Sequence, residues 1–247
     1  MNKNIHLMWK VKDLDNLHRS CFNSWVKHHP DWIVKLYDDV ELDTIIKIKL
    51  PDLYNRFAGC DGIKKSDAFR LGLVYVFGGL YVDIDTFCFK PIDSLVVNCD
   101  RCFFEDVKIE GGIYDYKPKF EYTNAIFYAN PKDRMIGRII TDLIRYGDDD
   151  KTIDKNMNVI LHTGPEFLSN CIKKYGMIWN IDVIGSDKFE WCDKMNRQSM
   201  VKSGKLIVNS GSYGLHLAVG SWIYGSMKFK YYEDVKDINL EAMDDYR

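Results

Sequence analysis

The stretch SDAFRLGLVYVFGGLYVDIDT, residues 66–86, contains the pattern that decides the fold. Ser66 is a residue type that starts helices, and the apolar residues after it recur at helical spacing until Gly78 and Gly79. The apolar run that follows the glycines predicts a buried strand over 80–85. A helix that turns sharply into a buried strand is typical of an α/β fold with a covered, largely parallel sheet.

Two aspartates, Asp83 and Asp85, stand at the end of that predicted strand. In an extended chain, residues two apart point to the same side with Cα atoms about 6.6 Å apart, so both carboxylates can face one ion. Hard carboxylate oxygens suit Mg²⁺ or Mn²⁺, which complete their coordination with water and substrate phosphates. A D-x-D is common by chance, but two charges at the mouth of a buried strand are costly unless a cation or hydrogen bonds stabilise them. The pattern therefore predicts a metal site.

Asp67 and Arg70 are three residues apart and share one face of the preceding helix. An ordinary ion pair at this spacing contributes only about 0.3–0.5 kcal/mol to stability. The residues alone favour this structural interpretation over a role in binding.

Strand and helix patterns alternate on both sides of this stretch. The strands are predicted at 4–9, 32–39, 101–107, 124–130, 179–185 and 205–210, and the helices at 14–29, 40–50, 51–57 and 132–147. We expect one domain over 1–247, with 222–247 as a C-terminal tail that packs or lies on the acceptor side. Covered parallel sheets bind ligands at the carboxyl ends of their strands.

Three segments near the carboxyl end have less regular patterns. Residues 147–158, GDDDKTIDKNMN, are predicted to be a surface loop. Residues 159–167 are predicted to be a strand that turns into a helix, with Thr163 and Glu166 spaced as a capping box. Residues 210–222, SGSYGLHLAVGSW, are rich in glycine and are predicted to be a loop over the site.

The composition excludes several classes of protein. A net charge of -2 without a basic stripe argues against nucleic acid as a partner. The polar start and the lack of any run near ~20 apolar residues predict no signal peptide and no transmembrane segment, hence a soluble cytoplasmic protein. Seven cysteines, an odd number, fit reduced thiols better than a disulfide framework. Cys99 and Cys102 form a bare C-x-x-C with no second pair, which does not favour a zinc or redox site.

Residues 66–86 resemble the central motif of the DXD-type sugar transferases of glycosyltransferase family 32, which includes the yeast initiating α-mannosyltransferase, and of the clostridial glucosylating toxins. In that motif Ser-Asp is followed by an arginine three residues later, an apolar helix, Gly-Gly, an aromatic residue and Asp-x-Asp, and every position is filled here. Shorter matches fall in the family's order at 5–9 (IHLMW), 21–25 (CFNSW), 124–125 (NA), 163–165 (TGP), His216 and 221–222 (SW).

This resemblance implies a GT-A fold, a Rossmann-like sheet covered by helices. It implies a hexosyltransferase with a UDP- or GDP-hexose as nucleotide-sugar donor, a glycan or another hydroxyl compound as acceptor, and retention of anomeric configuration. Mn²⁺, or Mg²⁺ in its place, would bridge the D-x-D motif and the diphosphate and stabilise the charge on the leaving group. Golgi members of the family carry an N-terminal membrane anchor that this sequence does not show, so we expect a bacterial or viral type of enzyme.

The resemblance also implies roles for individual residues. Asp83, Asp85 and His216 are the expected metal ligands. Asp67 and Arg70 resemble the pair that holds the donor sugar and its ribose or phosphate groups, and with the two motif aspartates they make up the expected catalytic set. The other expected substrate contacts are Trp9 with the nucleobase, Asn124 with a sugar hydroxyl, Gly164, and Ser221 and Trp222 with phosphate oxygens.

Other interpretations stay open. YVDIDT also resembles the opening of haloacid-dehalogenase-type phosphohydrolases, although Phe87 fills the position where those enzymes have threonine or valine. A catalytically silent relative that only binds nucleotide sugars is a second alternative. Trp9, in a first strand, is equally typical of a core residue. The nucleoside, sugar and acceptor do not follow from spacing, because pockets that choose among hexoses differ by single hydroxyl contacts.

Overall fold

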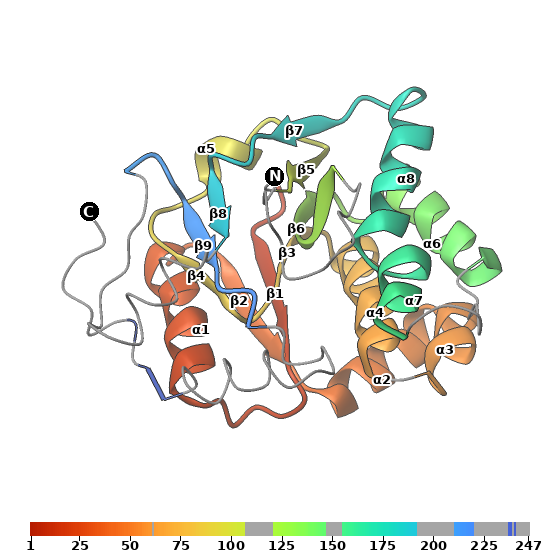
Figure 1. Cartoon of the computed structure of the whole chain (residues 1–247), viewed down its shortest axis with the longest axis horizontal. Coiled ribbons are helices and arrows are strands. Elements are labelled where there is room, and N and C mark those ends of the chain that lie inside the picture. The colour runs from red at the N-terminus through yellow and green to blue at the C-terminus, as the bar shows by residue number, and fades with distance from the viewer. Residues whose placement is uncertain are drawn as a thin grey trace.

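The computed structural model describes residues 1–60, 62–106, 121–146, 155–191, 210–219, 237–238 and 240. Helices and strands are mixed along this part of the chain, so the predicted α/β class is confirmed (Figure 1). The strands are β1 (Asn4–Met8), β2 (Ile33–Tyr37), β3 (Gly79–Val82), β4 (Thr86–Cys88), β5 (Arg101–Glu105), β6 (Tyr122–Ala129), β7 (Asp182–Ile184), β8 (Phe189–Trp191) and β9 (Gly214–His216). The helices are α1 (Asn16–His28), α2 (Asp39–Lys49), α3 (Pro51–Phe57), α4 (Gly62–Phe77), α5 (Asp93–Val96), α6 (Arg134–Tyr146), α7 (Lys155–His162) and α8 (Pro165–Gly176). None of these helices is long and apolar enough to cross a membrane.

The described strands form a central six-stranded sheet in the order β2-β1-β3-β6-β5-β7. β1 runs parallel to both β2 and β3, and β7 runs parallel to β5. β6 runs antiparallel to its neighbours β3 and β5. The central sheet is therefore mostly parallel, as the sequence predicts. A second, smaller sheet has the order β4-β9-β8.

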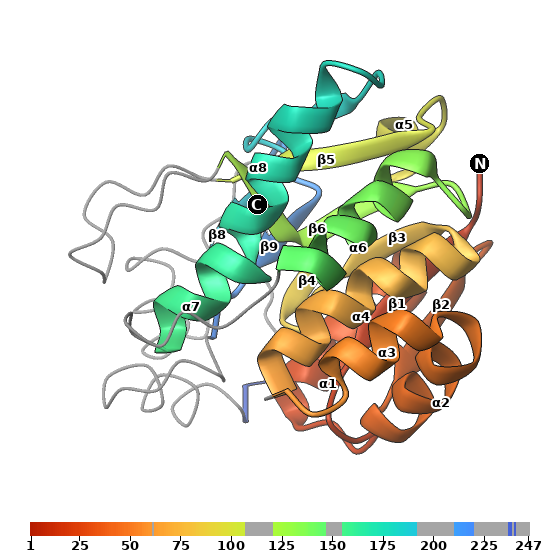
Figure 2. The same cartoon turned by 90° about the vertical axis from the view of Figure 1, so that its right-hand side faces the viewer.

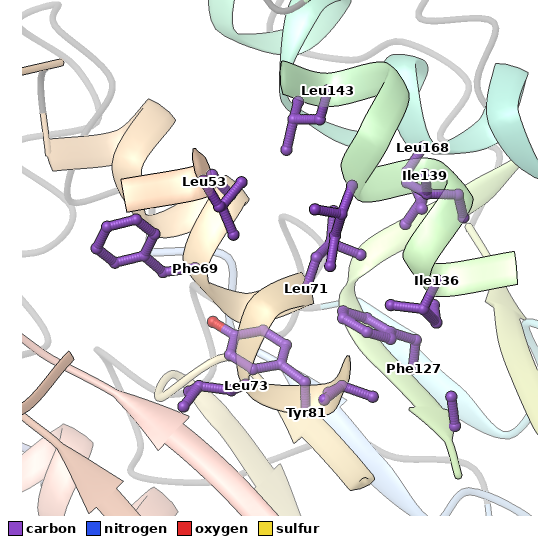
Figure 3. Close-up of a cluster of buried hydrophobic side chains, with 14 of the residues drawn as sticks. Leu53, Phe69, Leu71, Leu73, Tyr81, Phe127, Ile136, Ile139, Leu143 and Leu168 are labelled. Carbon is purple, nitrogen blue, oxygen red and sulfur yellow. The ribbon is translucent and has the colours of Figure 1, made fainter. Parts of the chain in front are cut away.

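The two faces of the central sheet are covered differently. Figures 1 and 2 show α2, α3, α4, α6 and α8 on one face, and Figure 1 shows α1 and the smaller sheet on the other. The helices and the sheet share a helix-side cluster of buried apolar side chains (Figure 3). Its labelled members are Leu53, Phe69, Leu71, Leu73, Tyr81, Phe127, Ile136, Ile139, Leu143 and Leu168.

Strand β3 packs on both faces, because successive side chains of a strand point to opposite sides. Tyr81 belongs to the helix-side cluster, with its ring centroid 5.6 Å from that of Phe127. Leu80 and Val82 are fully buried in the cluster on the opposite face. Asp83, two residues after Tyr81, consequently lies on the side of the sheet that α4 covers.

Gly78 and Gly79 make the turn from α4 into β3 in conformations that other residues rarely adopt. Their φ angles are +65° and +107°. A Cβ on Gly79 would lie 2.3 Å from the carbonyl oxygen of Asn4, and one on Gly78 would lie 2.4 Å from Cδ of Pro131. The predicted helix end and sharp turn are confirmed, and the close approach of β1 is a second reason for glycine at position 79.

Helix α4 begins earlier than the sequence predicts. It starts at Gly62, and the Ser66 hydroxyl donates a hydrogen bond to the carbonyl oxygen of Gly62, 2.7 Å away. Ser66 is therefore an interior residue of the helix and not its cap. A serine that bonds back one turn is compatible with a helix interior as well as with a helix start, so the sequence pattern was ambiguous.

The segment before α8 also differs from its prediction. Residues 155–162 form helix α7 instead of the end of a loop and a strand, because a short apolar run does not distinguish a buried helix from a strand. Helix α8 has Gly164 as its N-cap and no side-chain cap hydrogen bond, so the predicted capping box of Thr163 and Glu166 is wrong. Residues 147–154 and most of the predicted strand 205–210 lie outside the described residues.

His6 connects β1 to the glycine turn. Its buried ring has Nε2 2.9 Å from the carbonyl oxygen of Gly78 and Nδ1 3.1 Å from the hydroxyl of Tyr37. A neutral ring with its proton on Nε2 donates to the carbonyl group and accepts from the hydroxyl group. Burial lowers the pKa of His6 from 6.5 to about 4, so the ring is neutral at pH 7.

We predict that His6 makes the fold sensitive to acid. Because its pKa is lower in the folded state, its contribution to stability is present above pH 6.5 and is lost as the pH falls from 6.5 toward about 4. Between pH 7 and pH 5, the free energy of unfolding should fall by about 2 kcal/mol more in the wild type than in His6→Gln. Glutamine can make both hydrogen bonds but does not titrate. Urea denaturation of both variants at the two pH values measures the difference, and an equal fall in both would contradict the assignment.

Candidate active site

The D-x-D pair forms a turn at the end of β3. The N–H of Asp83 still donates to the carbonyl oxygen of Ala125 on β6, at 2.8 Å, and the chain then reverses with the N–H of Thr86 donating to the carbonyl oxygen of Asp83, at 3.0 Å. The expected extended conformation of the pair is therefore wrong, because the chain must change direction to enter β4. The two carboxylates nevertheless meet, since the turn brings Asp85 back beside Asp83.

Asp83 is oriented from the helix side of the sheet. Its Oδ1 accepts a hydrogen bond from the Tyr81 hydroxyl at 2.6 Å and lies 3.1 Å from Nη1 of Arg70. Its Oδ2 lies 4.0 Å from Nε2 of His216. One oxygen is thus held by protein groups while the other faces the histidine.

Asp85 is oriented from the opposite side, by the smaller sheet and the residues that follow it. Its Oδ2 accepts a hydrogen bond from the N–H of Val219 at 3.0 Å, and its carbonyl oxygen accepts one from the N–H of Leu217 at 2.9 Å. Its Oδ1 lies 3.2 Å from Nε2 of His216. In Asp85, as in Asp83, one carboxylate oxygen is held by protein groups while the other faces the imidazole of His216.

His216 reaches the aspartates because it is part of a strand. Residues 214–216 form β9, which pairs with β4 so that His216 lies opposite Thr86. The loop predicted at 210–222 is therefore partly β-strand, and His216 lies beside the two motif aspartates. A three-residue strand is too short to show a period in the sequence.

The side chains of Asp83, Asp85 and His216 each place one ligand atom within 4.8 Å of the others. Two carboxylate oxygens and an imidazole nitrogen are a donor set that suits Mn²⁺, and the two oxygens alone suit Mg²⁺. The three residues predicted as metal ligands are thus brought together by the fold.

Charges in this cluster act strongly on one another. Burial raises the pKa of Asp83, and the Arg70 guanidinium partly offsets this. Burial also opposes ionisation of Asp85, but His216, and more weakly His18, hold the pKa of Asp85 at about 2. Burial opposes a positive charge on His216, yet the neighbouring Asp85 raises the pKa of the imidazole above its usual value. A protonated imidazole here would put positive charge beside both carboxylates, as a bound cation would.

Asp67 and Arg70 extend the cluster along α4. Nη2 of Arg70 lies 3.1 Å from Oδ1 of Asp67, while Nη1 donates to the carbonyl oxygen of Asn124 at 2.8 Å. The side-chain amide of Asn124 donates to Oδ1 of Asp67 at 2.9 Å. The guanidinium carbon also lies 4.9 Å from the ring centroid of Tyr81. Asp67 and Arg70 are therefore an ion pair, as their spacing suggests, and they also adjoin the D-x-D turn.

Two residues of this cluster, Thr163 and Tyr81, were not predicted as site residues from the sequence. Thr163 donates a hydrogen bond to Oδ2 of Asp67 at 2.9 Å, across 96 positions of sequence, and nothing in the local TGP pattern distinguishes this role from a helix cap. Tyr81 donates to Asp83, and here a signal existed, because residues two apart around the end of a strand can share a face.

Trp9 follows β1, and Asp83 follows the adjacent parallel strand β3, so both lie at the same edge of the sheet. The Trp9 ring is partly buried against the core, with its centroid 4.3 Å from that of His18. His18 is in turn held by Asp15, whose Oδ2 lies 2.8 Å from its Nδ1. This position allows both the base-stacking and the core interpretation of Trp9.

Gly164 lies directly after Thr163, at the start of α8. Its N–H donates to the carbonyl oxygen of Val159 at 2.8 Å. The predicted phosphate contacts Ser221 and Trp222 lie outside the described residues.

The family comparison covers the central part of this site. Residues 15–101 match the family model described as "Glycosyltransferase sugar-binding region containing DXD motif". The matched range includes α4, the glycine turn and both motif aspartates, whereas Asn124, Thr163 and His216 lie beyond it.

Two curated fungal proteins are similar to the chain. Inositol phosphoceramide mannosyltransferase 1 of Schizosaccharomyces pombe is 28% identical over 175 residues, which cover 69% of this chain and 51% of that protein. The initiation-specific alpha-1,6-mannosyltransferase of Candida albicans is 29% identical over 106 residues, covering 40% of this chain and 28% of that protein. The chain thus matches about half or less of the length of these relatives. Both are fungal and give no support to the expected bacterial or viral setting.

A solved structure supports the fold. The PaToxG glycosyltransferase has a TM-score of 0.50 and 17% sequence identity, over 72% of this chain and 70% of that one. At this identity the similarity concerns the fold alone, and it agrees with the GT-A type α/β architecture predicted from the sequence. Residues 15–101 are thus similar to the sugar-binding region of DXD-motif glycosyltransferases.

Proposed function

We propose that the chain is a metal-dependent glycosyltransferase that moves a hexose from a nucleotide-diphosphate sugar to a hydroxyl group of a glycan or similar acceptor. The observation that carries the proposal is the convergence of Asp83, Asp85 and His216 beside the Asp67–Arg70 pair. Mannose is the first hexose to test, because both curated relatives are named mannosyltransferases. Retention of anomeric configuration and the single domain over 1–247 belong to the same proposal.

The proposed metal ligands are Oδ2 of Asp83, Oδ1 of Asp85 and Nε2 of His216. Each of these atoms faces the other two, while the second oxygen of each aspartate is held by hydrogen bonds or ion pairs. A bound Mn²⁺ or Mg²⁺ would supply positive charge to the diphosphate of the donor and so favour its departure. The chain's own part is to hold the two carboxylates in place and to present Nε2 of His216, which would lose its proton when the ion binds.

The donor would lie along the edge of the sheet between Trp9 and Arg70. Trp9 is the proposed platform for the nucleobase, and Arg70 is the proposed cation for phosphate or ribose groups. Asp67 and Asn124 are proposed to act on the sugar, with Gly164 near them at the start of α8. Ser221 and Trp222 are proposed phosphate contacts.

Two alternatives are distinguished by simple assays. A phosphohydrolase would release phosphate from simple phosphoesters and ignore nucleotide sugars, and the match to a glycosyltransferase sugar-binding region argues against it. A silent relative would bind the donor without turning it over. Phosphate release from simple phosphoesters would identify a phosphohydrolase. Product analysis with UDP- and GDP-hexoses in the presence of Mn²⁺ separates a transferase from a relative that binds the donor without turning it over.

Asp85→Asn should abolish sugar transfer and donor binding that depends on Mn²⁺, because the amide lacks the charge that holds the cation. The matched control is Asp13→Asn, the same change at a side chain that is 95% exposed. Transfer is measured with labelled donor, and melting temperatures verify that both variants fold. Residual activity above about a tenth of wild type, a loss of only ~1.4 kcal/mol, would contradict the metal assignment.

His216→Ala should weaken Mn²⁺ binding at least about tenfold, or ~1.4 kcal/mol. Since the raised pKa of His216 means that a proton must leave before Nε2 binds metal, wild-type affinity should increase as the pH rises through and above 6.5. The variant should show a smaller increase. Calorimetric titration with MnCl₂ at pH 6 and pH 8 tests both statements, with His28→Ala as the control. An affinity and pH dependence equal to wild type would remove His216 from the site.

Trp9→Ala should weaken nucleotide binding by about 1–3 kcal/mol, the scale of aromatic stacking on bases. Trp9→Phe, which keeps an aromatic face, should retain most of the affinity. UDP and GDP titrations with Mn²⁺ measure the change. A lower melting temperature with unchanged nucleotide affinity would favour the core interpretation instead.

A further inference from the structure

Thr163 lies in the connection between α7 and α8, and its side chain is turned away from the helix that it was expected to cap. Its hydroxyl donates to Oδ2 of Asp67 at 2.9 Å, and Thr163 is only 2% exposed. The hydroxyl oxygen of Thr163 also lies 3.2 Å from the carbonyl oxygen of Val159. A hydroxyl has one proton, and a carboxylate is the stronger acceptor of the two, so the bond to Asp67 is the principal one.

The carboxylate of Asp67 is held by donors from three separate parts of the fold. Oδ1 lies 2.9 Å from the side-chain amide of Asn124 and 3.1 Å from Nη2 of Arg70. Oδ2 accepts the hydrogen bond of Thr163. These donors come from β6, α4 and the α7–α8 connection, and Asp67 itself is only 3% exposed. The hydrogen bond from Thr163 to Oδ2 thus helps to fix the rotation of the Asp67 carboxylate about χ2.

The orientation of Asp67 is passed on to the D-x-D turn through Arg70. The guanidinium group lies 3.1 Å from Asp67 through Nη2 and 3.1 Å from Oδ1 of Asp83 through Nη1. Because the guanidinium is planar and rigid, a rotation of Asp67 moves both contacts together. Arg70 and the Tyr81 hydroxyl both contact Oδ1 of Asp83, and Oδ2 is the oxygen that faces His216.

The backbone beside Thr163 is itself constrained. The N–H groups of Thr163 and Gly164 both donate to the carbonyl oxygen of Val159, at 3.1 and 2.8 Å. A Cβ on Gly164 would lie 3.0 Å from that oxygen and 3.1 Å from Cα of Ile160. The absence of a side chain at Gly164 lets the connection pass close to α7, which directs the Thr163 hydroxyl toward α4.

A second polar contact ties α7 to the same helix. Nζ of Lys64 lies 3.3 Å from Oδ1 of Asn158, and both residues are buried. Lys64 and Asp67 are three residues apart on α4 and therefore lie on one side of it. The contacts of Lys64 with Asn158 and of Asp67 with Thr163 therefore both join α4 to the α7–α8 region.

We propose that Thr163 is a positioning residue for the metal and donor site: its hydroxyl orients Asp67 and, through Arg70, the oxygen of Asp83 that faces the metal. In this view Gly164 acts by placing Thr163. The inference rests on the proposed metal-dependent function and adds a residue to it that lies outside the matched sugar-binding region.

The test compares Thr163→Val, which keeps the shape and removes the hydroxyl, with Thr163→Ser, which keeps the hydroxyl. We expect Thr163→Val to weaken MnCl₂ binding about tenfold, equivalent to ~1.4 kcal/mol, and Thr163→Ser to remain within about threefold of wild type. Thr44→Val is the matched control, because the Thr44 hydroxyl donates within its own helix, to the carbonyl oxygen of Val40 at 2.8 Å. If Thr163→Val does not fold, Thr163→Ala replaces it under the same criteria.

A double-mutant cycle with Asp67→Asn tests whether Thr163 acts through Asp67. We expect Thr163→Val to have no further effect on MnCl₂ binding in the Asp67→Asn background. Wild-type affinity in Thr163→Val, equal losses in the valine and serine variants, or a full additional loss in the Asp67→Asn background would each overturn the positioning role. A wild-type protein that does not bind MnCl₂ would overturn the proposed metal site and the positioning role with it, whereas the preceding outcomes overturn the positioning role alone.

Discussion

The ion pairs of the buried Arg70 guanidinium are the interactions on which the rest of the site depends. Arg70 lies 3.1 Å from a carboxylate oxygen of both Asp67 and Asp83 and packs on the ring of Tyr81. Without this cation, two carboxylates would be buried close together, and desolvation and mutual repulsion would favour their protonation. Arg70 therefore allows an acidic motif to end a fully buried strand. The glycine turn serves the same arrangement, because it brings β3 back along α4 so that Asp83 meets Arg70, about two turns before the end of the helix.

The site is built where two sheets meet, and each sheet holds one aspartate. The central sheet positions Asp83 through β3 and its hydrogen bond to β6, whereas the smaller sheet and the residues after it position Asp85 and His216. A cation bound among these side chains would link the two sheets. Metal binding and the packing of the smaller sheet are consequently expected to be coupled in this protein, since an ion that binds only the assembled site stabilises that assembly.

Strong local patterns in the sequence predicted much of the fold. The α4–β3 unit, the strands at β1, β2, β5 and β6, and the amphipathic α6 all have periodicity or glycine punctuation that identifies them. The prediction failed at short elements. α7 was taken for a loop and a strand, and β4 and β9 were missed because three residues do not establish a period. The turn at Asp85 was missed for another reason. It depends on the smaller sheet β4-β9-β8, which no local pattern in the sequence predicts.

The sequence by itself determined the α/β class, the order of the main elements and the identity of the acidic, basic and histidine side chains available for chemistry, because these follow from local periodicity and from a dense motif at 66–86. The tertiary structure alone decided which oxygen of each aspartate faces His216, that Thr163 bonds to Asp67 instead of capping α8, and that Trp9 packs on His18. These contacts join residues that are far apart in the chain or lie on different elements. Their geometry depends on how sheets and helices pack, and packing is a property of the whole folded chain that no single segment carries.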